Sequence, residues 1–318
     1  MSRYQILSLD GGGIRGVLSA VLLARLAQAE PKLLGAVDLY AGTSTGAVLA
    51  LGLAAGLPAQ QLVALYREHG RDVFADTAID NIRDVGNLIG AQYSATNFKR
   101  LLIQTFGDKR LRDLPVRVLV ASFDLDNDAY DPSAFRTWKP KFFHNFAGED
   151  SDGAERIVDV ALRTTAAPTY FPVYQGYVDG GVVANNPAMC AIAQALSTAT
   201  LRARPGGNTG ATRRVRLEDI ALLSIGTGRA PQYLTEQSAD WGLSQWARPV
   251  IDIMINGGVD VVNYQAAHLL GDRYLRLNPS LDTNVALDAV EAVPQMVALA
   301  ERLDLTPALT WLRREFLR

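Results

Sequence analysis

The chain has 318 residues, of which 48% are hydrophobic and 20% charged, and its formal net charge is −2. This composition excludes a disordered chain and argues against a protein devoted to nucleic acid, which needs a strongly basic surface. The single cysteine, Cys190, excludes an internal disulfide and a cysteine-based metal cage, and the longest apolar run, 47–57, is too short to span a bilayer.

In chain order, short apolar runs alternate with stretches of helical periodicity. The expected strands are 6–9, 36–42, 116–125, 177–181 and 220–228. The expected helices are 15–29, 45–56, 58–70, 155–167, 240–256 and 259–270, followed by a mainly helical segment at 286–317. Continuous apolar strands alternating with helices are typical of a parallel sheet covered on both faces. We therefore expect an α/β protein with three layers, α/β/α, around a mainly parallel central sheet.

Two segments between these elements have an unusual composition. The sequence WKPKFFHNF at 138–146 is interpreted as core and loop packing, with an acyl pocket or a lipid surface as the alternative. The basic segment 202–216 is interpreted as a solvated loop, with an anionic partner or a membrane surface as the alternative.

The first strand ends in the sequence DGGGIRG, which has two interpretations. Gly11, Gly13 and Gly16 fit the G-x-G-x-x-G pattern of dinucleotide sites, and Asp38 lies at about the right distance to bind a ribose. However, Asp38 begins its strand, whereas a ribose-binding acid ends one. The alternative is that the amides of this loop stabilise negative charge on a substrate oxygen, with Arg15 fixing the loop or adding positive charge.

The second strand ends in GTSTG, a G-x-S-x-G pattern followed by an apolar helix. This layout is that of a nucleophile elbow, in which Ser44 stands on a sharp turn between a strand and a helix. Gly42 and Gly46 leave room for that turn. The pattern predicts that Ser44 is a nucleophile and favours the oxyanion interpretation of the first loop, because neighbouring strand ends then supply both functions.

A nucleophilic serine needs a base. None of the three histidines, His69, His144 and His268, is expected just after a strand end, where a catalytic histidine usually stands. Asp179 in VDGG is the stronger candidate because it ends an expected strand and is followed by two glycines. The alternative is a turn aspartate that binds its own backbone.

The sequence contains no complete EF-hand, H-E-x-x-H or P-loop motif for binding a metal ion or a phosphate. The sequence DLDND starts at Asp124 with calcium-loop spacing, but Ala129 and Phe135 stand where an EF-hand needs glycine and glutamate. The sequence contains no H-E-x-x-H zinc motif and no P-loop. We therefore expect neither a metal ion nor a cofactor.

Three motifs in this order, DGGGIRG, GTSTG and DGG, resemble the patatin-like phospholipase family, and LRTTAAPTYFP, VDGGVVANNP and SIGTG support the resemblance. It covers roughly residues 3–230. The resemblance implies an α/β/α fold, a Ser–Asp dyad without histidine, and metal-free hydrolysis of acyl esters in lipids. The matching positions are Ser44 for the nucleophile, Asp179 for its partner, and Gly11, Gly12, Gly13 and Arg15 for the oxyanion loop.

We accordingly expect a serine acyl hydrolase that acts on phospholipids or other acyl-ester lipids, with peripheral contact to a membrane surface and a cytoplasmic location. Its catalytic core is expected at 1–230, with a mainly helical part at 231–318 packed on the same domain. Two alternatives stay open: a nucleotide-binding oxidoreductase that uses the GGGIRG loop, and an interaction module that keeps the fold without the activity.

Overall fold

The computed structural model describes residues 3–73, 93–127, 135–198, 214–231, 233 and 240–318. Most of the basic segment 202–216 therefore lies outside the described residues, as does Asp128 of DLDND. None of the helices within the described ranges is long and apolar enough to cross a membrane.

The centre of the fold is a seven-stranded sheet in the order β4-β3-β2-β1-β6-β7, with β5 also paired to β3. The strands are β1 (Tyr4–Leu9), β2 (Leu39–Thr43), β3 (Arg117–Asp124), β4 (Lys139–His144), β5 (Tyr177–Asp179), β6 (Ile220–Ile225) and β7 (Tyr274–Leu277). Strands β3, β2, β1, β6 and β7 run parallel, whereas β4 and β5 pair antiparallel with β3. The prediction of a mainly parallel sheet is confirmed.

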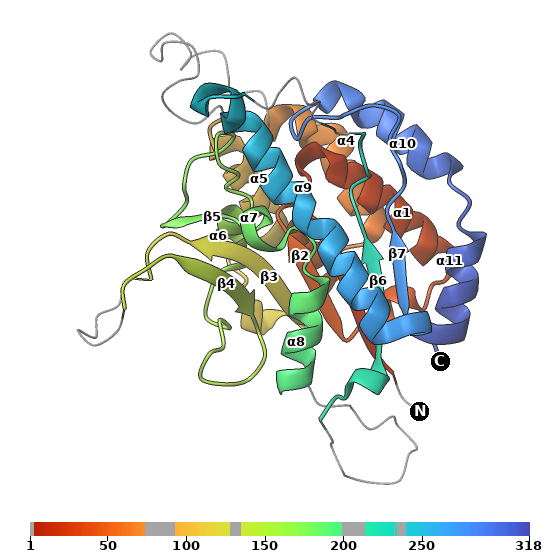
Figure 1. Ribbon diagram of the computed structural model, residues 1–318. Coiled ribbons are helices and arrows are strands. Elements are labelled where there is room, and N and C mark those ends of the chain that lie inside the picture. The colour runs from red at the N-terminus through yellow and green to blue at the C-terminus, as the bar shows by residue number, and fades with distance from the viewer. Residues whose placement is uncertain (1–2, 74–92, 128–134, 199–213, 232, 234–239) are drawn as a thin grey trace.

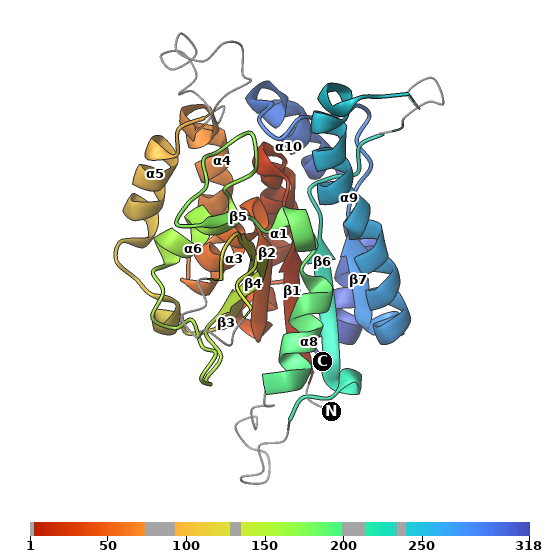
Figure 2. The ribbon, with the colours of Figure 1, turned by 60° about the vertical axis from the view of Figure 1, so that its left-hand side comes forward.

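Helices cover both faces of this sheet (Figure 2). They are α1 (Gly16–Ala29), α2 (Leu33–Ala36), α3 (Thr45–Ala54), α4 (Ala59–Val73), α5 (Thr96–Phe106), α6 (Ile157–Thr164), α7 (Gly181–Ala184), α8 (Ala188–Thr198), α9 (Leu243–Leu270), α10 (Val293–Arg302) and α11 (Thr306–Trp311). Alternate strand residues supply two separate cores, because side chains alternate along a strand: Leu7 packs with α1 and α3, and Ile6 packs with α8 and α9. The expected three-layer α/β/α arrangement is confirmed.

Several elements differ from the sequence-based expectation. The segment 138–146 is not a loop but contains strand β4, and helix α5 and strand β7 were not expected at all. The two helices expected at 240–256 and 259–270 are one helix, α9, which continues through Gly257 and Gly258. A glycine inside a helix costs only about 1 kcal/mol, so packing of the rest of α9 against the sheet is enough to keep it continuous.

Strand β7 joins the C-terminal part to the central sheet. It pairs in parallel with β6, with Ser224 opposite Arg276, and so extends the sheet by one strand at its edge. Figure 1 shows α9, β7, α10 and α11 packed along the same body as the N-terminal elements. The C-terminal part therefore contributes a strand as well as helices.

Candidate active site

Ser44 occupies a strained turn between β2 and α3. Its φ of 52° and ψ of −124° lie in a region that side chains other than glycine rarely adopt. A Cβ atom at Gly46 would lie 2.2 Å from the carbonyl oxygen of Leu9, and one at Gly42 would lie 2.4 Å from that of Gly46. Both glycines are therefore required by the close approach of the backbone, as the elbow interpretation predicts.

A hydrogen bond to the end of helix α6 also holds the Ser44 turn in place. The Ser44 N–H donates to Thr164 Oγ1 at 2.9 Å, and the Thr164 hydroxyl donates to the carbonyl oxygen of Ala121 at 2.5 Å. Helix α3 begins at the next residue, so the Ser44 side chain stands at a helix N-terminus. The helix dipole at that position favours negative charge that develops near the serine.

The loop 10–15 follows β1 and lies beside the elbow. The Gly11 N–H donates to the carbonyl oxygen of Asn185 at 3.0 Å, and the Ile14 N–H to that of Leu287 at 2.7 Å. Within the part of the chain that the structure describes, the N–H groups of Gly12 and Gly13 have no hydrogen-bond acceptor, and both residues line the pocket that contains Ser44. They are the two amides of the loop that are available to a substrate oxygen, whereas Gly11 serves to hold the loop.

Two buried arginines fix this loop. The Nε of Arg15 donates to the carbonyl oxygen of Gly12 at 3.4 Å. Burial lowers the pKa of Arg15, and the negative charge of Asp252 on α9 opposes that shift. Arg276 on β7 forms a bidentate ion pair with Asp10, with 2.9 Å between Nη1 and Oδ1. Asp10, at the start of the loop, is thus anchored by Arg276, a residue far away in the sequence.

Asp179 ends β5 and faces Ser44. The two side chains line the same pocket, and Asp179 Oδ1 accepts the Gly181 N–H at 2.7 Å. Burial raises the pKa of Asp179 to about 6, and the nearby Ser44 hydroxyl and the Gly181 N–H oppose this shift. A carboxylate with this pKa is a far better base near neutral pH than a solvated aspartate, while it is still mostly ionised there.

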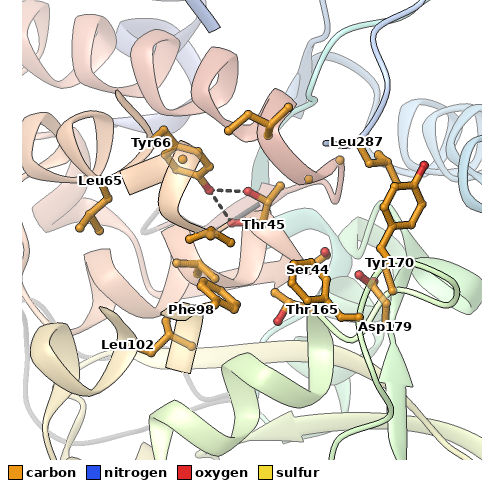
Figure 3. A pocket seen from close by; sticks show the side chains of 18 of the residues that line it. Ser44, Thr45, Leu65, Tyr66, Phe98, Leu102, Thr165, Tyr170, Asp179 and Leu287 are labelled. Carbon is orange, nitrogen blue, oxygen red and sulfur yellow. Dashed lines mark hydrogen bonds between the residues drawn. The ribbon is translucent and has the colours of Figure 1, made fainter. Parts of the chain in front are cut away.

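Ser44 and Asp179 lie together at one end of an apolar pocket (Figure 3). Its far part is formed by α4 and α5, which contribute Leu65, Phe98 and Leu102 among other side chains. Helix α3 contributes little beyond Thr45 and Val48, because most of it packs in the core. The pocket therefore offers a long apolar space next to one hydroxyl and one carboxyl group.

None of the three histidines lines this pocket. His69 is on α4 beside Asp72, and on α9 the Nδ1 of His268 contacts the carbonyl oxygen of Tyr264 at 2.8 Å. His144 is the last residue of β4 and so lies within a strand instead of following one. Its Nε2 lies 3.5 Å from Asp150.

The dinucleotide interpretation is not supported by the position of Asp38. It precedes β2 and accepts the Gln5 N–H at 2.8 Å, at the start of the parallel strands β1 and β2. The glycine loop follows the opposite ends of these strands. An acid at this place is about one strand length from the loop and is out of reach of a ribose bound there.

The described residues contain no group of three or more His, Cys, Asp or Glu side chains that is suited to hold a metal ion. Asp126 of the DLDND sequence forms an ion pair with Arg136, with 2.7 Å between Nε and Oδ1. The Asp126 carboxylate is therefore already paired with a positively charged side chain of the same protein.

Three contributors to the site were not found from the sequence. Arg276 gives no local signal, because its role depends on a strand that was not expected. Thr164 lies within LRTTAAPTYFP, which matches the family without revealing what the threonine does. Asn185 lines the pocket, and its Oδ1 lies 2.2 Å from where a Cβ of Gly11 would stand. The only local signal for Asn185 is its sequence, ANNP.

Comparison with known proteins agrees with this geometry. The sequence model of the patatin-like phospholipase family matches residues 7–192. The chain is 31% identical to Protein teg of Priestia megaterium over 99% of this chain and 100% of that protein. It is 30% identical to the cGAMP-activated phospholipase of Pseudomonas aeruginosa, over 86% of this chain and 78% of that protein.

Among solved structures, VipD from Legionella pneumophila aligns with 94% of this chain and 67% of its own, at 13% identity and a TM-score of 0.39. The family match covers more than half of the sequence, including the glycine loop, the elbow and VDGG. This chain belongs to the patatin-like phospholipase family.

Proposed function

We propose that the protein is a serine hydrolase that cleaves fatty acyl esters of lipids, with Ser44 as nucleophile and Asp179 as general base. The observation that carries this proposal is that the Ser44 side chain and the buried Asp179 carboxyl group lie together at one end of an apolar pocket. Membership of the patatin-like phospholipase family supports a lipid substrate, and the name of the Pseudomonas relative supports a phospholipid.

In the first step, Ser44 Oγ attacks the ester carbonyl carbon while its proton moves to Asp179. The substrate oxygen becomes an oxyanion, which the N–H groups of Gly12 and Gly13 stabilise together with that of Thr45 at the start of α3. When the tetrahedral intermediate collapses, Asp179 gives its proton to the leaving alcohol. The fatty acyl group stays on Ser44 as an ester.

In the second step, water attacks the acyl-enzyme, and Asp179 accepts the proton of this water. The same amides stabilise the second oxyanion, and collapse releases the fatty acid and returns the proton to Ser44. Every proton transfer passes through one carboxyl group, so no histidine is needed. The apolar pocket binds the acyl chain, and each methylene it buries adds about 0.8 kcal/mol.

A lipid substrate places this enzyme at a membrane surface, and we propose peripheral contact there for a protein located in the cytoplasm. We favour an active hydrolase over an interaction module with the same fold, because the strained Ser44 turn and the buried Asp179 carboxyl are costly features that a binding role does not require.

A fluorophosphonate probe tests the nucleophile directly, because it reacts covalently with activated serines. We expect one label per chain, at Ser44, and none in Ser44→Ala. Ser94→Ala, which removes a hydroxyl outside the pocket, is the control and should label as the wild type does. Undiminished labelling of a folded Ser44→Ala variant would show that another residue is the nucleophile. Lipid mass spectrometry of membranes incubated with wild type and Ser44→Ala then identifies the substrate.

A further inference from the structure

Helix α9 presents an uncovered apolar face over much of its length. Its inner side is buried and includes Ile255, which lines the pocket. On the opposite side, Ile253 is 49% exposed, Val261 56% and Tyr264 64%. Figure 1 shows the helix running obliquely across the front of the molecule, with no other element in front of it. Such a row of apolar side chains along one helix needs a partner.

Four of the six exposed large apolar residues of α9 lie in pairs that are symmetric about Gly257, whereas Met254 and Leu269 have Asp260 and Gln245 at their mirrored positions. Ile253 and Val261 lie four residues before and after it, and Val250 and Tyr264 lie seven residues before and after it. At 100° per residue, these four fall within about 40° of the direction in which Gly257 points. Trp246 and His268 continue the same line, eleven residues on either side. We call this line of positions, from Trp246 to His268, the seam.

Apolar residues at mirrored positions suit an antiparallel pair of identical helices. In a two-fold pair centred on Gly257, each residue meets the residue at the mirrored position of the second copy. Val250 then meets Tyr264, Ile253 meets Val261, and Gly257 meets its own copy. Large side chains on each side of a glycine also form a hollow into which the second helix fits.

Among the residues that the structure describes, none makes a contact that requires a glycine at position 257. A Cβ atom there would meet only Ile253 Cγ2, at 3.9 Å, so alanine would fit and would favour the helix by about 1 kcal/mol. A residue without a side chain is needed where two backbones cross closely. The second copy provides such a crossing.

The charges on this face are compatible with self-association. The seam contains no lysine, arginine, aspartate or glutamate. The acid at its flank, Asp260, lies 3.6 Å from Arg229 of the same chain, and in the antiparallel pair it stands opposite Met254. Pairing two copies therefore does not bring like charges together, which would otherwise oppose the contact.

We propose that the outer face of α9 is the interface of a symmetric dimer, in which α9 of a second copy packs antiparallel across Gly257. Because the inner side of the same helix carries Ile255 in the pocket wall and Asp252 near Arg15, the dimer contact also fixes the α9 wall of the site.

The test uses the full chain and two neighbouring glycines. Gly257→Arg places a cation on the two-fold axis, where it meets its own copy. Gly258→Arg is the matched control, because it points about 100° away from the seam, and nothing lies within 4 Å of an added Cβ there. Mass is measured by light scattering after size exclusion over a wide range of concentrations, and circular dichroism checks the fold.

We expect the wild type and Gly258→Arg to have twice the 34.4 kDa mass of one chain, and Gly257→Arg to have the mass of one chain. In a Cys190→Ser background, Gly257→Cys should form an intermolecular disulfide, which requires Cα atoms about 6 Å apart, and Gly258→Cys should not. A monomeric wild type overturns the proposal, as does a dimeric Gly257→Arg. A monomeric wild type that binds phosphatidylcholine vesicles and loses this binding in Gly257→Arg would assign the face to a lipid surface instead.

Discussion

Replacing Asp179 by asparagine separates the catalytic role of this residue from its cost to stability. The amide has the same size as the carboxyl group. Its oxygen can still accept the Gly181 N–H, so the local packing is retained. What is lost is the ability to accept a proton. We therefore expect a folded protein whose turnover falls by about 100- to 10,000-fold, the usual contribution of a general base.

The same substitution should lower turnover but raise the free energy of unfolding. The pKa of Asp179 is raised from 3.8 to about 6 by burial, so the folded protein holds this proton more tightly than the unfolded chain does. The free energy of unfolding of the wild type therefore falls as the pH rises from about 4 to about 6, and this contribution is constant above. A difference of about two pKa units corresponds to roughly 3 kcal/mol. Asp179→Asn should accordingly be more stable than the wild type above pH 6, by up to about that amount, and equally stable near pH 4.

The assay combines urea unfolding between pH 4 and 8 with turnover of a soluble p-nitrophenyl ester. In the wild type, kcat/KM should rise with pH around the pKa of about 6 and then level off, because the base must be ionised. Asp219→Asn is a matched control, because Asp219 is also buried and accepts the Arg216 N–H at 2.9 Å, outside the pocket. It should keep full turnover.

Two results would refute this reasoning. The first is a folded Asp179→Asn variant with near wild-type turnover, particularly if a histidine variant such as His144→Ala is folded and inactive. The second is an Asp179→Asn variant whose stability runs parallel to that of the wild type from pH 4 to 8. The first result removes Asp179 as the base, and the second removes burial as the cause of its raised pKa.

Three further changes test the surroundings of the dyad. Gly12→Val brings a Cβ to 2.3 Å from Thr227 Oγ1 beside a free amide and should lower turnover by about 100- to 1,000-fold, whereas Gly35→Val, with open space around it, should not. Arg276→Gln leaves Asp10 buried without its cation and should lower the free energy of unfolding by about 3–5 kcal/mol in urea, with the double variant Asp10→Asn/Arg276→Gln recovering part of it. Leu101→Trp should shift the preferred p-nitrophenyl ester to shorter acyl chains, because Leu101 lines the pocket, while Ile103→Trp, on the exposed side of α5, should leave the preference unchanged.

The sequence by itself determined the parts of this protein that depend on local backbone geometry. The turns around Ser44 and at Gly11–Gly13 were predictable, because glycines at fixed offsets between a strand and a helix indicate a sharp turn of the backbone. The central strands were predictable because they are buried on both faces and appear as continuous apolar runs. The family followed from three such motifs in order.

The tertiary structure alone decided what depends on distant contacts. Strand β7 is short and half-exposed, so its residues show no pattern until β6 is beside them. Its Arg276 reaches Asp10 across 266 positions, a contact that no local signal encodes. The far part of the apolar pocket is formed by α4 and α5, whose apolar residues have the same periodicity whether they line a cavity or fill a core.

The raised pKa of Asp179 was also decided by the tertiary structure. Burial depends on everything that packs around a group and not on its neighbours in the sequence. VDGG was enough to suggest an acid at a strand end. Only the fold placed that carboxyl group in the pocket with Ser44 and buried it, and this burial raises its pKa to about 6.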